Sequence, residues 1–80
     1  MGIEDTIRGF IIRELGWRGR DEELDDAFPL TENKVLDSMG IFKLVSFLEN
    51  EYRIEIDDEE LVPQNFSTIG AVAALVRSKQ

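Results

Sequence analysis

Hydrophobic residues recur with helical spacing in three separate stretches of the chain. The first stretch predicts a helix over residues 3–15, whose apolar face consists of Ile3, Ile7, Phe10, Ile11 and Leu15. Glu4 and Asp5 lie near the positive end of this helix, where the helix dipole favours carboxylates. Gly16 follows directly and is placed to supply the left-handed residue that ends such a helix.

The second stretch predicts an amphipathic helix that begins at Asp37 or Ser38 and ends at Tyr52. Either Asp37 or Ser38 can cap the backbone N–H groups that follow, because both residue types accept hydrogen bonds at helix starts. The apolar stripe consists of Ile41, Leu44, Val45, Leu48 and Tyr52. Phe42 falls beside this stripe, and the opposite side carries Lys43, Ser46, Glu49 and Asn50.

The third stretch predicts a last helix, capped by Ser67 or Thr68 and followed by a polar tail over residues 77–80. Its apolar face consists of Ile69, Val72, Ala73 and Val76. The cations near its end suit the negative end of the helix dipole.

The connection between the first two helices, residues 16–36, has no helical periodicity. It contains an acidic run over residues 21–26 and a proline, Pro29, that a continuous helix would not tolerate. A loop of this length in a small domain is uncommon and often functional. We expect it to be ordered and held to the core by its apolar residues Trp17, Leu24, Phe28, Leu30 and Val35.

Residues 52–56 alternate like a strand, but no second strand-like segment exists to pair with them. We therefore expect an extended connector, followed by one short helical turn within residues 57–62 that ends at Pro63. The predicted fold is all-α, a small four-helix bundle of three main helices and one short helix, with a long loop between the first two.

Composition narrows the classes of function. The 80 residues contain 9 Lys and Arg, 17 Asp and Glu, and no Cys or His, giving a net charge of −8. We interpret residues 1–80 as one small acidic domain, monomeric and cytoplasmic. The absent residue types exclude disulfides, thiolate or imidazole catalysis and the metal sites built on those ligands. The negative charge disfavours nucleic acid, and no apolar run approaches the roughly 20 residues that span a membrane.

The candidate chemistry lies at the start of the second helix, in the string Leu36-Asp37-Ser38-Met39-Gly40. A hydroxyl at a helix N-terminus is well placed to carry a phosphodiester, because the first N–H groups and the dipole favour phosphate. No neighbouring residue supplies the base that an activated serine requires, so an autonomous hydrolase is disfavoured. The plain alternative is that Asp37 or Ser38 only caps the helix.

This string, followed by an amphipathic helix, resembles the Asp-Ser-Leu attachment motif of the acyl carrier and peptidyl carrier proteins. The resemblance implies that Ser38, flanked by Asp37 and Met39, receives 4′-phosphopantetheine from coenzyme A through a magnesium-dependent phosphopantetheinyl transferase. The thiol of the arm would then hold an acyl or aminoacyl group as a thioester. The protein would be a carrier and not an enzyme, loaded by a ligase or transferase and presenting its cargo to biosynthetic enzymes.

The resemblance extends over nearly the whole chain, because residues 54–56, 57–61 and 65–69 are similar to the family's third-helix loop, short third helix and lead into the fourth helix. Two departures matter. Met39 replaces the usual Leu, a swap of nearly equal volume. The predicted docking residues Leu36, Gly40, Ile41, Phe42 and Lys43 include no acid, unlike the second helix of bacterial fatty-acid carriers.

We therefore favour a stand-alone, type II carrier of a specialised polyketide, nonribosomal peptide or modified fatty-acid pathway. D-alanyl carriers share the Leu-Asp-Ser-Met-Gly string, so a D-alanyl or housekeeping fatty-acid role stays open. A hypothesis of a different class is a small helical adaptor that binds a partner helix through Ile41, Phe42 and the long loop, with no covalent group.

Overall fold

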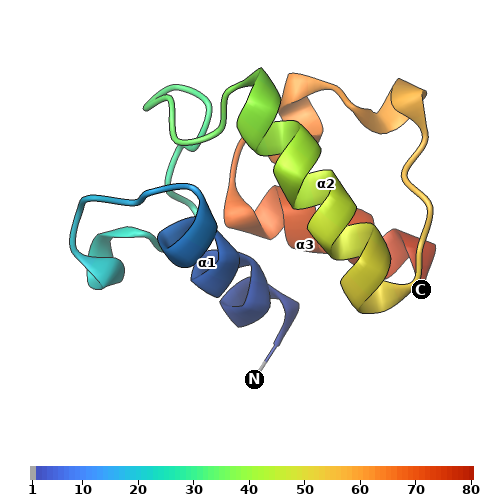
Figure 1. The fold of residues 1–80 in the computed structure, drawn as a ribbon, viewed down its shortest axis with the longest axis horizontal. Helices are drawn as coiled ribbons and strands as arrows, with labels where there is room; N and C mark the ends of the chain where they lie inside the picture. Colours follow the sequence, from blue (N-terminus) through green and yellow to red (C-terminus); the bar gives the residue numbers. More distant parts are fainter. Residues whose placement is uncertain (1) are drawn as a thin grey trace.

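The computed structural model describes residues 2–80 as three α-helices joined by loops and short 3-10 turns (Figure 1). The helices are α1 (Ile3–Glu14), α2 (Ser38–Tyr52) and α3 (Ile69–Lys79), and the turns are η1 (Asp21–Glu23), η2 (Asp58–Glu60) and η3 (Pro63–Phe66). Residues 2–80 contain no β-strand. The predicted all-α fold, with three main helices, a short helical segment and a long first connection, is confirmed.

The core forms where the apolar faces of the three helices meet. Helix α1 packs against both α2 and α3, and its Ile7 and Ile11 are fully buried. The larger fully buried side chains of the whole core are Ile7, Ile11, Leu24, Leu30, Leu44, Leu48, Phe66, Ile69, Val72 and Val76. Because members of this set come from every helix and from both long connections, the core joins all parts of the fold.

The long loop between α1 and α2 is ordered and packed, as predicted. Leu24 and Leu30 are fully buried, and the Trp17 ring meets the Phe28 ring edge to face at a centroid distance of 5.2 Å. Two backbone bonds tie the loop to the start of α3: Leu30 N donates to Ser67 O (2.8 Å), and Gly70 N donates to Asp26 O (3.0 Å). The sequence did not predict the 3-10 turn η1.

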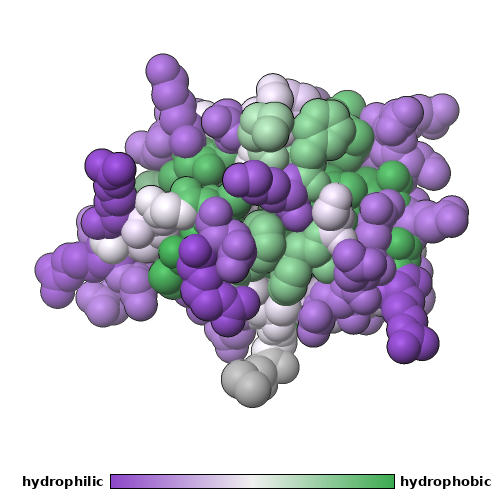
Figure 2. All heavy atoms as spheres, viewed as in Figure 1, coloured by the Kyte–Doolittle hydropathy of each residue, from purple (hydrophilic) through white to green (hydrophobic). Residues whose placement is uncertain are grey.

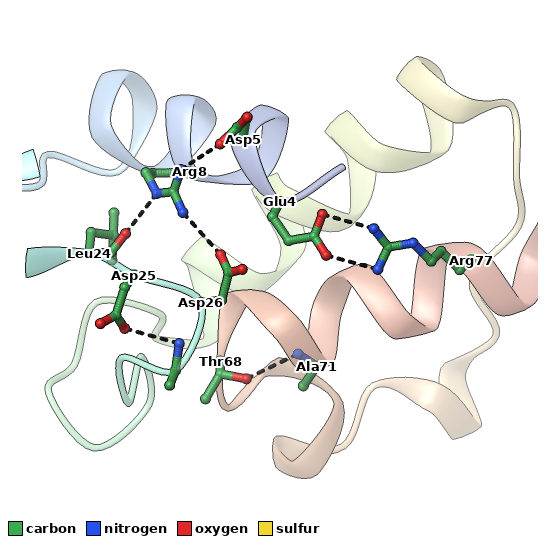
Figure 3. Close-up of polar contacts among 10 residues, drawn as sticks. Glu4, Asp5, Arg8, Leu24, Asp25, Asp26, Thr68, Ala71 and Arg77 are labelled. Carbon is green, nitrogen blue, oxygen red and sulfur yellow. Dashed lines mark hydrogen bonds and ion pairs between the residues drawn. The ribbon is translucent and has the colours of Figure 1, made fainter. Parts of the chain in front are cut away.

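The acidic run of this loop has structural uses. Asp26 accepts a hydrogen bond from Arg8 at 3.0 Å, and the side chain of Asp25 accepts one from Ala27 N at 3.0 Å (Figure 3). Glu23 accepts a hydrogen bond from the backbone N–H of Arg20 at 3.0 Å, which closes η1. Asp26 therefore ties the loop to α1, while Asp25 and Glu23 stabilise local turns.

The connection between α2 and α3 follows the predicted extended path and then departs from prediction. Ile54 and Ile56 are buried while Glu55 between them is exposed, as the alternating pattern requires. The short turn η2 lies within the predicted segment. The turn η2 ends before Pro63, as predicted, but Pro63 itself begins a second turn, η3, which was not predicted; proline suits the first position of a helical turn. The turn η3 buries Phe66 completely.

The helix ends confirm one expectation and resolve one alternative. Helix α1 ends at Glu14, and Gly16 has a φ of 71°, the predicted left-handed conformation. Helix α3 is capped by Thr68, whose hydroxyl accepts a hydrogen bond from Ala71 N at 3.0 Å. It runs to Lys79 and so includes most of the predicted polar tail.

Ion pairs connect segments that are distant in the sequence. Glu4 of α1 pairs with Arg77 of α3 at 2.8 Å (Figure 3), and Glu60 of η2 pairs with Lys79 of α3. The hydrogen bond from Arg77 lowers the pKa of the Glu4 carboxyl, and the hydrogen bond from Lys79 lowers the pKa of the Glu60 carboxyl. Both pairs tie α3 to another element.

We predict that acid weakens the fold through these two carboxyls. Their pKa values lie below the ordinary 4.5 in the folded chain, so the unfolded chain binds more protons as the pH falls toward and below 4.5. Their contribution to stability is present above that pH and is lost as the pH falls through the folded pKa. The midpoint of thermal unfolding, measured from pH 7 to pH 3, should fall less steeply in acid for Glu4→Gln/Glu60→Gln than for the parent chain.

A matched control is Glu59→Gln, an exposed residue of η2 for which no ion pair is recorded among residues 2–80. This control corrects for a second effect of acid: protonation of carboxylates reduces the repulsion among the negative charges of a chain whose net charge is −8. If the double variant and Glu59→Gln showed the same acid slope, the assignment to the two ion pairs would be wrong.

Candidate functional site at the start of α2

The start of α2 is set by Asp37. Its backbone is extended (φ −95°, ψ −173°), and its carboxylate Oδ1 accepts a hydrogen bond from Gly40 N at 2.8 Å. The backbone carbonyl of Asp37 accepts from Ile41 N at 2.9 Å, the first bond of the helix. Asp37 is therefore the N-cap, and Ser38 is the first residue of α2.

Ser38 is exposed, and no hydrogen bond of its hydroxyl is recorded among residues 2–80. The neighbouring Asp37 carboxylate is engaged in the cap, and the chain has no histidine or cysteine to act as a base. The hydroxyl is thus free to be modified but is not activated by its surroundings. This arrangement fits a group that an external enzyme attaches.

Gly40 brings the cap and the helix close together. A Cβ at this position would lie 3.3 Å from Asp37 Oδ1 and 3.5 Å from Leu36 Cδ2. Leu36 is 3% exposed and Gly40 is also buried. Because both are buried, Leu36 and Gly40 are removed from the predicted docking residues. They lie next to the Asp37 cap and are part of its packing.

The remaining docking residues lie at the surface of α2. Met39 is 65% exposed and Phe42 is 60% exposed, and they are the two large hydrophobic residues so exposed among residues 2–80. Lys43 is exposed and Ile41 is half-buried. Figure 2 shows apolar side chains gathered on the face where α2 runs in Figure 1, with polar side chains around them.

Two shallow hollows lie beside this surface. One of about 230 Å³ is lined by Glu14, Leu15, Lys34, Val35, Asp37, Met39, Gly40 and Lys43. A second of about 410 Å³ is lined by Phe10, Glu14, Phe42, Lys43 and Ser46. Glu14 and Lys43 belong to both, so the hollows adjoin between α1 and α2.

Sequence reasoning missed Lys34 and Glu14 as neighbours of the site. Lys34 has a left-handed backbone with a φ of 58°, which no glycine or asparagine signalled. Glu14 reaches the site only because α1 packs beside α2. The amphipathic pattern predicts which residues of each helix are buried. It does not predict which residues beside the apolar stripes of two different helices come close together.

Among residues 2–80, no ion pair is recorded for five of the nine cations, and two of these five, Lys34 and Lys43, lie near Ser38. Arg8, Arg20, Arg77 and Lys79 all take part in ion pairs. For Lys34 and Lys43, no ion pair is recorded in the described part of the chain. The first turn of α2 also carries no acidic residue. The surroundings of Ser38 are therefore locally less negative than the net charge of the chain suggests.

Within residues 2–80, no group of three or more Asp or Glu side chains is arranged to hold a metal ion. None of the helices described has the length and apolarity needed to cross a membrane.

Comparison with known proteins adds independent evidence. No protein-family model matches the chain. The probable acyl carrier protein PigG of Serratia sp. is 41% identical over 59 residues, which are 74% of this chain and 68% of PigG. The acyl carrier protein of Chlamydia trachomatis serovar D is 26% identical over 100% of this chain and 99% of its own length. That of Streptococcus thermophilus is 27% identical, over 99% of this chain and 97% of its own.

The fold is also found among solved structures. A chain in a crystal structure described as that of an FAD-dependent dehydrogenase superposes with a TM-score of 0.78 at 30% identity, covering 88% of this chain and 97% of that chain.

The resemblance inferred from the Asp37-Ser38 string and the helix order is thus confirmed by relatives that span most or all of the sequence. The chain belongs to the acyl carrier protein family, whose members are carriers and not enzymes and hold a covalently attached 4′-phosphopantetheine.

Proposed function

We propose that Ser38 carries the 4′-phosphopantetheine arm and that the protein serves a specialised biosynthetic pathway. The observation that supports this most is the geometry of the N-cap. The Asp37 carboxylate accepts the hydrogen bond from Gly40 N, so the exposed Ser38 hydroxyl is not needed to cap α2. Members of the family interact with a phosphopantetheinyl transferase and with biosynthetic enzymes, and the same two classes of partner are expected here.

The attachment reaction requires little from the chain itself. The Ser38 oxygen attacks the pantetheine-bearing phosphorus of coenzyme A, an O–P bond forms, and the pyrophosphate P–O bond breaks. Adenosine 3′,5′-bisphosphate leaves, and the base of the transferase takes the serine proton. When bound, the group supplies a terminal thiol that holds the cargo as a thioester.

The start of α2 stabilises the product of that reaction. The N–H groups in the first turn of a helix lack intrahelical acceptors, and the helix dipole adds a partial positive charge there. The phosphodiester would sit at this end, with Lys43 more than one turn along the same helix and Lys34 at the adjoining hollow. The residues thus fit an anionic group on Ser38.

Two observations support a specialised pathway. PigG, at 41% identity, is more similar than the acyl carrier proteins matched at 26% and 27%. The exposed residues Met39, Phe42 and Lys43 also present an apolar surface with a cation. A basic enzyme that recognises acidic carriers would meet a like charge there, which disfavours the housekeeping fatty-acid role.

We further propose that one partner is a flavin-dependent dehydrogenase that oxidises the carried group. The support is the crystal structure described as that of an FAD-dependent dehydrogenase. This fold covers 97% of the matched chain, so that chain is itself of carrier size and occurs in a structure named for a dehydrogenase. In such a step two hydrogens leave adjacent atoms of the cargo, a double bond forms between those atoms, and FAD becomes FADH2. The carrier's role is to present the cargo.

Replacing Ser38 with Ala should abolish loading and leave folding intact, since Asp37 and not Ser38 caps α2. Intact mass is measured after incubation with coenzyme A, magnesium and a broad-specificity transferase. The parent chain should gain one phosphopantetheine and the variant none. A variant that still gained the group would disprove the attachment site, and a folded, unmodified parent that gained nothing would favour the helical adaptor.

Replacing Asp37 with Ala should lower the free energy of unfolding by about 1 kcal/mol, the usual cost of a lost N-cap. Asp37→Asn keeps an oxygen acceptor for Gly40 N and should retain most of that stability. Urea unfolding followed by circular dichroism measures both. Equal losses in the two variants would show that the charge of Asp37, and not its hydrogen bond, stabilises α2.

The dehydrogenase of the matched crystal structure tests the proposed partner. Under anaerobic conditions, the loss of flavin absorbance should be faster with cargo on the carrier than with the same cargo on coenzyme A. Phe42→Ala should raise KM for the loaded carrier and change kcat little, because Phe42 is exposed and removed from the chemistry. Equal rates with carrier and coenzyme A would refute this partner.

A further inference from the structure

A further hollow lies between the two ends of the long loop that joins α1 and α2. Its wall consists of residues 15–19, which directly follow α1, and residues 33–35, which come shortly before the N-cap of α2. We call it the loop hollow. Two of these residues, Arg18 and Lys34, are cations, and the wall contains no acidic residue. No ion pair is recorded for either cation among residues 2–80, so both can pair with an anion from outside.

The acidic residues close to this wall in the sequence do not line the loop hollow. Glu14 and Asp37 line the hollow beside Ser38, and the Asp37 carboxylate is engaged by Gly40 N. Glu32 is exposed and lines neither of these two hollows. The charges on the wall of the loop hollow therefore favour an anion over a cation, although the net charge of the chain is −8.

The aromatic part of the wall is held in place. The indole Nε1 of Trp17 donates to Arg20 O at 3.2 Å, and the ring meets the Phe28 ring edge to face at a centroid distance of 5.2 Å. A Cβ on Gly19 would lie 2.6 Å from Trp17 Cζ2, so the glycine backbone packs directly against the indole ring. The shape of the loop hollow is therefore set by the fold before any partner binds.

Lys34 occupies a backbone position that usually holds glycine. Its φ is 58°, and two bonds close the turn around it: Lys34 N donates to Thr31 O (3.2 Å), and Val35 N donates to Leu30 O (2.9 Å). This is the bond pattern of the Schellman motif, whose left-handed residue is most often glycine because a side chain there is strained. Folding alone favours glycine at position 34, so the presence of lysine indicates a use for its side chain.

The loop hollow adjoins the attachment site. It shares Lys34 with the hollow of about 230 Å³ that is lined by Asp37 and Met39, on either side of Ser38. An enzyme that receives an arm on Ser38 must therefore approach this part of the loop. The loop hollow has a volume of about 260 Å³, below the roughly 300–1,000 Å³ of most small-molecule sites. This size suits one side chain of a partner better than a nucleotide or a cofactor.

We propose, resting on the carrier function proposed above, that the loop hollow is a docking site that receives an Asp or Glu side chain of a partner enzyme. Arg18 and Lys34 pair with the carboxylate, and the Trp17 ring packs against the methylene groups of that side chain. Arg and Trp are among the residue types that contribute most to binding at interfaces. The partner surface that meets the loop is then acidic, so charge complementarity selects partners at this point.

A titration of the full chain tests the loop hollow directly. The titrant is a short peptide of alternating Glu and Gly, and its control has Gln in place of Glu. In two-dimensional NMR at low salt, the Glu peptide should shift the Trp17 indole N–H and the backbone N–H signals of Gly19 and Lys34, and the Gln peptide should not. Lys34→Glu should abolish these shifts. If they persisted in that variant, or if inorganic phosphate alone shifted these signals and the Glu peptide did not, the proposal would be wrong.

Arg53 provides a matched control for Lys34. It is exposed, has a left-handed backbone with a φ of 54° at the opposite end of α2, and has no ion pair recorded within residues 2–80. Arg53→Glu makes the same change of charge as Lys34→Glu and should leave the shifts caused by the Glu peptide intact.

Replacement by glycine separates folding from binding. Lys34→Gly and Arg53→Gly should both raise the midpoint of thermal unfolding, because glycine adopts the left-handed conformation without strain. Lys34→Gly alone should weaken the shifts caused by the Glu peptide. A lower midpoint in Lys34→Gly would show that the lysine side chain serves the fold, and that result would overturn its assignment to a partner.

The dehydrogenase of the matched crystal structure tests docking with cargo on the carrier. Lys34→Glu should raise KM for the loaded carrier about fivefold, the upper range for one exposed ion pair, and leave kcat near that of the parent. Arg53→Glu should change neither. The difference in KM between Lys34→Glu and the parent should shrink as the salt concentration rises, because salt screens exposed charges.

The outcomes separate this proposal from the one on which it rests. If intact mass shows no arm on Ser38, the carrier function fails, while the titration still decides whether the loop hollow binds a carboxylate. If the arm is attached and the Glu peptide gives no shifts, the loop hollow is not a carboxylate site and the carrier function stands. If the peptide binds but Lys34→Glu and Arg53→Glu have equal KM, the loop hollow does not dock the partner and the proposal is overturned.

Discussion

The hydrogen bond from Gly40 N to the Asp37 carboxylate fixes where α2 begins, and the site depends on that starting point. Had Ser38 been the cap, its hydroxyl would accept the N–H bond and would lie in the non-helical flank of the helix. With Asp37 as the cap, Ser38 becomes the first helical residue, and its hydroxyl is exposed. The buried Gly40 lets the cap close, since a Cβ there would approach the Asp37 oxygen to 3.3 Å.

The parts of the fold that could be predicted from the sequence are those in which the spacing of hydrophobic residues matches the burial of one face. The apolar stripes located all three helices, and the alternation of Ile54 and Ile56 located the connector. The choice between Asp37 and Ser38 as cap stayed open because both side chains accept the same bond. The turn η3 escaped prediction because Pro63 can end one turn or begin the next, and only the burial of Phe66 in the core decides.

The sequence predicted only those site residues that lie close to Ser38 along the chain. Leu36 and Gly40 each lie two residues from Ser38 in the sequence, yet both are buried, Leu36 just before the N-cap and Gly40 in the first turn of α2. Glu14 and Lys34 are distant in the sequence, yet packing of α1 and the loop brings them to the same hollow. The ion pairs of Glu4, Asp26 and Glu60 hold α3 and the loop, whereas no ion pair is recorded for Lys43 in residues 2–80.

The exposure of Phe42 is best explained by use and not by folding. Burying a phenylalanine stabilises a fold by about 1.5–3 kcal/mol, and Phe42 forgoes much of this at 60% exposure. Phe47, on the same helix, shows that an aromatic ring of α2 can pack against another element, because its ring stacks on that of Phe10 at a centroid distance of 4.5 Å. A carrier must release each partner before meeting the next, so its contact surface must be small and fully exposed. We propose that the exposed Met39 and Phe42, on either side of the first turn that follows Ser38, form this contact surface.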